Sequence, residues 1–205
     1  MNRSTINLHL GDSLEAMKLM EDNAYDLAIV DPPYGIGNWV QQTGNVRGKA
    51  VDWNDSIPSK DYFQQLKRVS KEQIIWGANY YNCFEKGGAI VWNKHVKRET
   101  NLSVCEIASY SRLKRVDYID LIWQNLNRKE ESIHPCQKPI KLYEWLLKNY
   151  AKEGDKILDT HGGSMSIALA CHNLKFDLDL WELDEDYHAA GVKRFEQHKK
   201  QLQLF

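Results

Sequence analysis

Short apolar runs alternate with helix-like spacings along most of this sequence. The run at residues 6–10 alternates apolar and polar positions, as a strand with one buried face does. The run at 27–30 is continuously apolar, which is typical of a strand buried on both faces. Four further short runs are expected to be strands, at residues 74–76, 89–92, 156–158 and 176–181.

Helical patterns fall between these runs. Leu14, Met17 and Met20 recur at roughly helical spacing, and Asp12 with Glu15 resembles a capping box ahead of them. Three more helices are expected to begin near residues 139, 164 and 184. Strands that alternate with helices predict an α/β fold, in which a largely parallel sheet is covered on both faces.

Composition narrows the class of protein. A chain of 205 residues, 42% apolar and 27% charged, fits one soluble globular domain, or two at most. No apolar run approaches the roughly 20 residues of a membrane span, and the N-terminus lacks a signal-peptide pattern, so we expect a cytoplasmic protein. The widely spaced Cys83, Cys105, Cys136 and Cys171 favour neither disulfides nor a zinc site. A net charge of −1 excludes a uniformly basic protein, but a local basic patch can still bind nucleic acid.

Two segments depart from the alternating pattern. Residues 35–58 are rich in Gly, Asn, Gln and charge, which predicts a long mobile loop that serves as a lid or clamp. Residues 94–129 hold eight Lys or Arg against four Asp or Glu, with aromatic residues between them. This segment favours contact with DNA phosphates, although a solvated charged face is the common alternative. The candidate DNA-binding residues are Lys94, Lys97, Arg98, Arg112, Lys114 and Arg115.

The first chemical motif is Asp31-Pro32-Pro33-Tyr34, directly after the buried strand at 27–30. Open α/β sheets place their ligand chemistry at the carboxyl ends of strands. Two prolines remove two N–H donors, which leaves the Asp31 carboxylate and the proline carbonyls as acceptors with few local donors. Such a corner suits an exocyclic amine, and the Tyr34 ring can stack on a flat base. A rigid turn that merely ends the strand is the alternative.

A second motif joins a strand, a glycine turn and a helix at residues 158–164, Leu-Asp-Thr-His-Gly-Gly-Ser. Glycines let the backbone approach a nucleotide-like ligand closely. Glu182 ends the next strand, at about the offset from Gly163 where an acid typically holds ribose hydroxyls. The layout predicts an adenosine-containing cofactor, and the lack of a full G-x-G-x-x-G pattern argues against NAD. A third motif, His-Pro-Cys-Gln-Lys-Pro at 134–139, by itself indicates only a helix start.

In this order, the motifs resemble the permuted, β-type DNA amino-methyltransferases, and most of all the small phage- and prophage-type adenine-N6 enzymes. The resemblance extends from about residue 6 to 195. It implies one Rossmann-like domain over residues 1–205, with a mostly parallel sheet, an antiparallel edge strand and a small basic target-recognition insert at about 94–133. It also implies a bacterial or phage-infected cell, S-adenosylmethionine as cofactor and double-stranded DNA as substrate, with a homodimer among the assemblies allowed.

The resemblance also implies roles for individual residues. Asp31 and the Pro32 carbonyl would accept hydrogen bonds from the target amine of a flipped base, Pro33 would complete the motif, and Tyr34 would stack on that base. No metal site is implied. The expected cofactor-binding residues are Asp12, Asp31, His134, Gln137, Lys138, Asp159, Thr160, His161, Gly162, Gly163, Ser164 and Glu182.

Some positions depart from the family pattern. Thr160 and His161 replace a common Pro-Phe pair, Cys136 replaces a common Thr, and Met165 takes the place of a glycine. We expect Met165 to lie inside the helix that follows. Cytosine N4 presents the same donors as adenine N6, but cytosine enzymes more often carry Ser in place of Asp31, which favours adenine. Methylation of RNA or of a protein amide, and a non-catalytic DNA-binding protein of the same fold, stay open.

Overall fold

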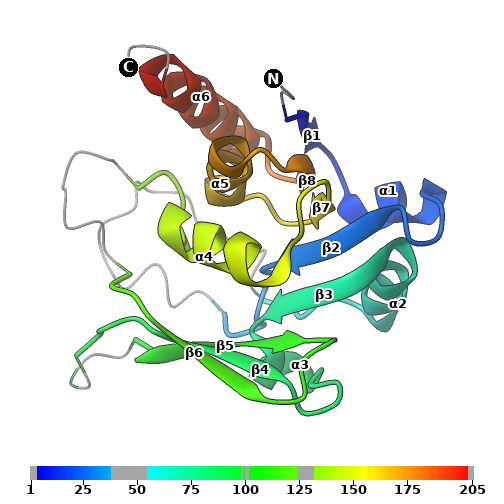
Figure 1. Cartoon of the computed structure of the whole chain (residues 1–205), viewed down its shortest axis with the longest axis vertical. Coiled ribbons are helices and arrows are strands. Elements are labelled where there is room, and N and C mark those ends of the chain that lie inside the picture. Colours follow the sequence, from blue (N-terminus) through cyan, green and yellow to red (C-terminus); the bar gives the residue numbers. More distant parts are fainter. Residues whose placement is uncertain (1–3, 38–54, 98, 100–101, 124–131, 203–205) are drawn as a thin grey trace.

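The computed structural model describes residues 4–37, 55–97, 99, 102–123 and 132–202. Most of the predicted loop at 35–58, part of the predicted insert at 94–133 and the candidate Arg98 lie outside these ranges. The described residues form one eight-stranded sheet with helices on both faces (Figure 1). The strands are β1 (Ile6–Leu10), β2 (Tyr25–Val30), β3 (Ser70–Trp76), β4 (Ala89–Asn93), β5 (Cys105–Tyr110), β6 (Val116–Asp120), β7 (Lys156–Asp159) and β8 (Asp177–Glu182). The helices are α1 (Ser13–Leu19), α2 (Lys60–Val69), α3 (Ala78–Tyr81), α4 (Ile140–Tyr150), α5 (Ser166–Leu174) and α6 (Glu185–Leu202).

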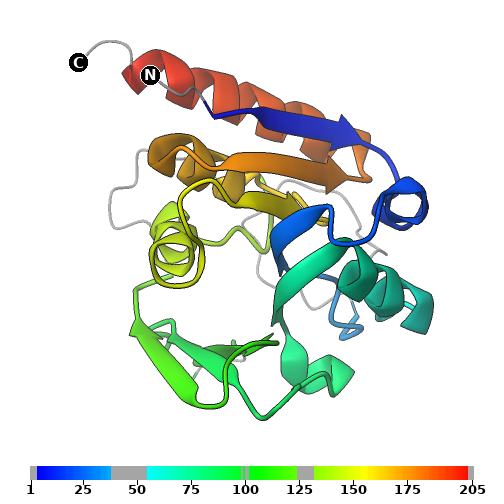
Figure 2. The same cartoon turned by 45° about the vertical axis from the view of Figure 1, so that its right-hand side comes forward.

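Two apolar clusters bury the two faces of the sheet. Leu27 and Ile29 of β2 point into the larger cluster, beneath α4, α5 and α6, and Figure 2 shows α6 lying along β1 and β8. Ala28 and Val30 point to the opposite face and pack against α1 and α2. Successive side chains of a strand alternate between faces, so a strand buried on both must be apolar throughout. The structure therefore confirms the interpretation of the continuous run at 27–30.

The strand order is β1-β8-β7-β2-β3-β5-β4-β6. All neighbouring strands pair in parallel except at β5, which runs antiparallel to both β3 and β4. The expected mostly parallel α/β sheet is confirmed, but its antiparallel strand lies inside the sheet rather than at an edge. β5 and β6 were not predicted, because their apolar positions are interrupted by charged residues in a segment interpreted as an insert. Much of that segment is part of the sheet.

The topology brings acidic residues to one edge. Asp31 follows β2, Asp159 ends β7 and Glu182 ends β8, so all three carboxylates lie at the carboxyl ends of parallel strands. Because β5 runs the opposite way, its beginning lies at the same edge and carries Glu106. The candidate site is therefore assembled from strands that are far apart in sequence.

We expected Met165 to lie inside a helix, but the structure places it outside. It directly precedes α5 in the left-handed conformation, with φ at +57°. This conformation costs a residue with a side chain about 1–2 kcal/mol, which explains a preference for glycine here. The Met165 side chain is fully buried and packs closely over Gly191 of α6. Burial of a Met side chain contributes about 1.5–3 kcal/mol, which offsets the conformational cost.

Substitution at Met165 can separate these two effects. Met165→Gly and Met165→Ala both remove the buried side chain, but only alanine keeps the left-handed strain. We expect both variants to be less stable than the wild type, and the alanine variant to be the less stable of the two by about 1 kcal/mol. Urea unfolding measures the difference, and equal stabilities would contradict a conformational cost at this position.

Candidate active site

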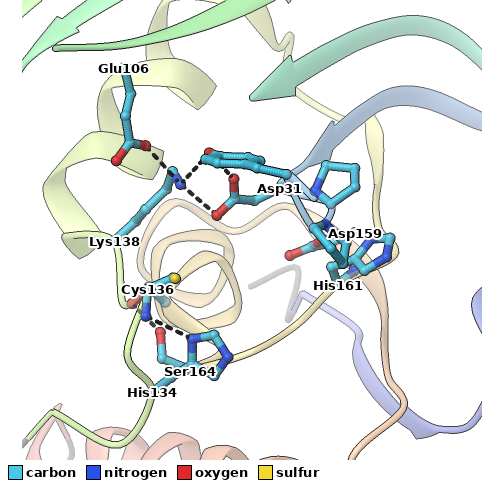
Figure 3. Close-up of polar contacts among 12 residues, drawn as sticks. Asp31, Glu106, His134, Cys136, Lys138, Asp159, His161 and Ser164 are labelled. Carbon is cyan, nitrogen blue, oxygen red and sulfur yellow. Dashed lines mark hydrogen bonds and ion pairs between the residues drawn. The ribbon is translucent and has the colours of Figure 1, made fainter. Parts of the chain in front are cut away.

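The Asp31 carboxylate is held on both of its oxygens. Lys138 donates to Oδ2 at 2.5 Å, and the Tyr34 hydroxyl donates to Oδ1 at 2.6 Å (Figure 3). The Asp31 side chain remains 16% exposed. A carboxylate oxygen offers two lone pairs, so each oxygen can still accept a further hydrogen bond. Asp31 is thus an oriented acceptor with remaining capacity.

The proline carbonyls also have a local donor. The hydroxyl of Tyr81, at the end of α3, lies 2.5 Å from the Pro32 carbonyl oxygen and 2.8 Å from that of Pro33. The expectation of few local donors was therefore wrong, since Tyr34, Tyr81 and Lys138 all reach this corner. Burial raises the pKa of the Tyr81 hydroxyl, so it stays a donor at neutral pH. The Pro32 carbonyl retains one lone pair for a ligand.

The Tyr34 ring lies between two neighbours. It stacks on Tyr80 with ring centroids 4.9 Å apart, and Tyr80 is 38% exposed. It also presses on Gly77, where a Cβ atom would lie only 2.4 Å from the ring. Gly77 has φ at +74°, so the left-handed conformation and the close approach both require glycine. A base that stacks on the Tyr80 side of Tyr34 must displace the Tyr80 ring.

Lys138 connects Asp31 to a second carboxylate. Its Nζ lies 3.0 Å from Oε2 of Glu106, and Lys94 donates to Oε1 of Glu106 at 2.8 Å. Burial alone would lower the pKa of Lys138, but Asp31 and Glu106 outweigh it and hold that pKa above its usual value. Burial would likewise raise the pKa of Glu106, but Lys138 and Lys94 hold it below its usual value. Lys138 and Glu106 are therefore both charged at neutral pH.

The glycine turn is hydrogen-bonded to the end of β8. Gly163 N–H donates to Oε2 of Glu182 at 2.6 Å, and the Asp184 N–H donates to Oε1 at 2.9 Å. In the same turn, His161 N–H donates to Oδ1 of Asp159 at 3.0 Å. Thr160 Oγ1 lies 2.7 Å from the Tyr62 hydroxyl, which ties the turn to α2. Backbone donors thus orient both acids of the predicted cofactor site.

The pKa of Asp159 is affected by burial and by the negative charges near it. Burial, together with the charges of Asp31 and Glu182, raises its pKa to about 7, although the His161 N–H and the Lys138 charge partly oppose this shift. The three carboxylates are therefore close enough to repel one another. A group of carboxylates of this kind favours a cationic ligand.

The segment at 134–138 lies beside both parts of the site (Figure 3). The His134 ring faces Gly163, where a Cβ atom would lie 3.4 Å from it, and Lys138 contacts Asp31. His134 Nδ1 accepts from Cys136 N–H at 3.2 Å, and burial lowers the pKa of His134 to about 4, so the ring is neutral at pH 7. Gln137 Oε1 accepts from the Ile133 N–H at 3.2 Å, which stabilises the segment itself.

Asp12 caps α1, because its Oδ1 accepts from Leu14 N–H at 2.7 Å. Glu15, the other half of the predicted capping box, pairs instead with Lys18 at 2.8 Å. Gly11 N–H donates to the backbone carbonyl of Glu182 at 2.9 Å, so Asp12 lies near the end of β8. The cap is confirmed, and a contact with the cofactor stays a prediction.

The predicted basic patch is not one surface. Arg112, Lys114 and Arg115 lie in the turn between β5 and β6, at the opposite edge of the sheet from Asp31, because β5 is antiparallel. Arg112 pairs with Glu72 at 3.0 Å and Arg115 with Asp117 at 2.7 Å. Lys94 is largely buried against Glu106. Among the described candidates, the exposed Lys97 follows β4 on the Asp31 side of the sheet.

Sequence reasoning missed Glu106, Tyr80, Tyr81 and Gly77. Three of these directly follow β3, at the same edge as Asp31, so the rule that ligand sites follow strand ends was a usable signal. Glu106 had no such signal, because only the reversed direction of β5 brings it to this edge.

Comparison with known proteins identifies the class. The family model described as DNA methylase matches residues 70–193, more than half of the chain. The chain therefore belongs to the DNA methylase family.

Within the described ranges, no helix has the length and apolarity needed to cross a membrane.

The individual relatives have low sequence identity to this chain, but their alignments cover most of it. The Type II methyltransferase M.HpaI of Haemophilus parainfluenzae is 22% identical, over 90% of this chain and 72% of its own length. The PvuII cytosine-N4-specific DNA methyltransferase structure is 15% identical with a TM-score of 0.66, and the alignment covers 97% of this chain and 92% of that one. The M1.HpyAVI complex with S-adenosylmethionine is 20% identical with a TM-score of 0.61, over 92% and 99% respectively.

The raised pKa of Asp159 predicts a pH-dependent stability. Its folded pKa of about 7 lies above the ordinary value of 3.8, so the folded chain holds a proton that the unfolded chain loses between these values. This contribution is fully present below about pH 4 and is lost as pH rises towards 7. Relative to Asp159→Asn, the wild type should lose at most about 1.4 kcal/mol of unfolding free energy per pH unit in that window. Urea titrations from pH 4 to 8 measure this, and parallel curves would contradict the assignment.

Proposed function

We propose that this chain transfers a methyl group from S-adenosylmethionine to an exocyclic amine of a DNA base, with adenine N6 as the target. The observation that carries the proposal is the Asp31–Pro32 acceptor pair, placed at the sheet edge that also holds Asp159 and Glu182. Membership of the DNA methylase family supports the same chemistry.

The acidic edge fits this cofactor. S-adenosylmethionine carries a sulfonium and an ammonium group, and Asp159 and Glu182 supply negative charge at this edge, where Lys138 offsets the charge of Asp31. When bound, the cofactor supplies an electrophilic methyl group. The residues that family resemblance assigns to holding it are Asp12, Asp31, His134, Gln137, Lys138, Asp159, Thr160, His161, Gly162, Gly163, Ser164 and Glu182. The likeness to the M1.HpyAVI complex supports this assignment.

Asp31 and the Pro32 carbonyl act on the target amine. The lone pair of an exocyclic amine is delocalised into the ring, which makes the nitrogen a poor nucleophile. Two acceptors that bind the two amine hydrogens favour a tetrahedral nitrogen, on which the lone pair is available. Tyr34, Lys138 and Tyr81 fix both acceptors beforehand, so little reorganisation is needed. Catalysis on this view is positioning and electrostatics, without a covalent enzyme intermediate.

The base must leave the duplex to reach this corner, because its amine is otherwise paired and stacked. Tyr34 offers the stacking surface, after displacement of the partly exposed Tyr80. In this proposal residues 1–205 act as one domain, in which a target-recognition element within 94–133 and a clamp within 35–58 contact double-stranded DNA. Lys97 is placed to contact phosphates on the Asp31 side.

Adenine and cytosine present the same two amine hydrogens, so the acceptor pair does not choose between them. Asp31 supports adenine, because cytosine enzymes of this kind more often carry Ser at that position. The likeness to the PvuII cytosine-N4 enzyme supports the second candidate, cytosine N4.

The deciding experiment incubates the purified chain with labelled S-adenosylmethionine and unmethylated bacterial DNA. The DNA is then digested to nucleosides, and the labelled product is identified by mass. We expect N6-methyladenine. N4-methylcytosine would retain the mechanism and change the target, whereas unlabelled DNA with bound cofactor would favour an RNA substrate or a non-catalytic protein.

Replacement of Asp31 tests its role in the reaction. Asp31→Asn keeps the shape of the side chain but removes the charge and presents N–H donors. We expect kcat to fall at least about 100-fold, while the calorimetric Kd for the cofactor changes far less, because the other residues expected to hold it are unchanged. Asp31→Ala should be at least as inactive, although it leaves the buried Lys138 without this partner. A collapse of cofactor binding or of the melting temperature with Asn would make Asp31 structural instead.

A further inference from the structure

Four alternating charges lead from β4 to the catalytic motif. Lys94 directly follows β4, Glu106 lies on β5, Lys138 precedes α4 and Asp31 follows β2. The consecutive contacts are 2.8 Å, 3.0 Å and 2.5 Å, and Figure 3 shows the last two, on either side of Lys138. Two carboxylates and two ammonium groups sum to zero charge, so the row is balanced although it is largely withdrawn from solvent. The proposed reaction uses only its last two members, Lys138 and Asp31, and nothing in the sequence pointed to Glu106.

Lys138 is enclosed on several sides. Its side chain is only 5% exposed, and its Nζ lies 5.5 Å from the centroid of the Trp76 ring and 5.9 Å from that of Tyr34. A lysine stem has several rotatable bonds and therefore needs external contacts to fix its ammonium group. Glu106 and Asp31 supply these contacts from opposite directions.

Glu106 is anchored from its far side by Lys94. Its Oε1 receives an aligned hydrogen bond from Lys94, whereas its Oε2 attracts Lys138 at 3.0 Å without hydrogen-bond alignment. The contact with Lys138 is thus an attraction between charges, which weakens slowly with distance. Lys138 in turn makes its short, aligned hydrogen bond to Asp31.

We propose that Glu106 and Lys138 are positioning residues for Asp31. Glu106, anchored by Lys94, fixes the Lys138 ammonium, and Lys138 fixes the plane of the Asp31 carboxylate so that its free lone pairs face the target amine. This inference rests on the proposed function and adds the residues that keep its acceptor in place. It also gives Lys138 a different role from the cofactor contact implied by family resemblance.

The two roles for Lys138 predict different kinetics. If Lys138 positions Asp31, Lys138→Met lowers kcat about 100-fold, the size of effect expected when a reacting group is misplaced by about 1 Å. The calorimetric Kd for S-adenosylmethionine then stays within about twofold of the wild-type value. If Lys138 holds the cofactor, that Kd rises strongly, and this result would overturn the proposal. Lys138→Arg, which retains the charge, should recover part of kcat.

Glu106 is tested by a double-mutant cycle. Glu106→Gln should lower kcat about 10-fold, and Glu106→Gln with Lys138→Met should be no slower than Lys138→Met alone, because Glu106 acts through Lys138. Independent contributions would multiply to about 1,000-fold and would contradict the proposal. Glu144→Gln is the matched control, since Glu144 is a partly buried acceptor for Asn173 at 2.9 Å outside the site, and its kcat should equal that of the wild type.

A charge-balanced variant separates positioning from stability. Glu106→Gln leaves an uncompensated positive charge and is expected to lower the melting temperature. The double variant Lys94→Met with Glu106→Gln removes one charge of each sign, so its melting temperature should return towards the wild-type value. If kcat stays low in the stabilised double variant, Glu106 positions Lys138; if kcat returns to the wild-type value, Glu106 only balances charge and the proposal fails. An inactive wild type would defeat the proposed function, whereas an active wild type with unchanged variants would defeat this inference alone.

Discussion

The burial of Asp159 close to two other carboxylates is the constraint on which the site depends. The parallel arrangement of β2, β7 and β8 brings Asp31, Asp159 and Glu182 to one edge of the sheet. Each is oriented by donors, and Lys138 lies against Asp31. Burial of Asp159, the most buried of the three, raises its pKa, and the negative charges of Asp31 and Glu182 add to this effect. A methyl donor with positive charge is the ligand that such an edge accommodates.

The single antiparallel strand has a large effect on this edge. Had β5 run parallel to β3, its first residues would lie at the far edge, and Glu106 could not approach Lys138. The same reversal carries Arg112, Lys114 and Arg115 away from the site. One change of strand direction therefore brings a carboxylate to the catalytic motif and removes three cations from it.

Much of the fold and the site followed from local patterns. The strand buried on both faces was predictable because its apolar run is continuous, and Asp31, Asp159 and Glu182 were predictable because each lies at the carboxyl end of a predicted strand. β5 and β6 were missed because charged residues interrupt their apolar positions. The donors to Asp31 and Pro32 were missed for another reason, since Tyr81 and Lys138 reach them from positions 49 and 107 residues away in the chain. Local patterns carry no information on such pairings.

The raised pKa of Asp159 also couples ligand binding to proton exchange. Below about pH 7 the carboxyl holds a proton, and a cation bound beside it favours the ionised form. Such a ligand therefore expels a proton into the solvent, and its affinity increases with pH until the carboxyl is already ionised. The measured heat of binding then includes protonation of the buffer, so it differs between buffers of different ionisation enthalpy although the affinity does not.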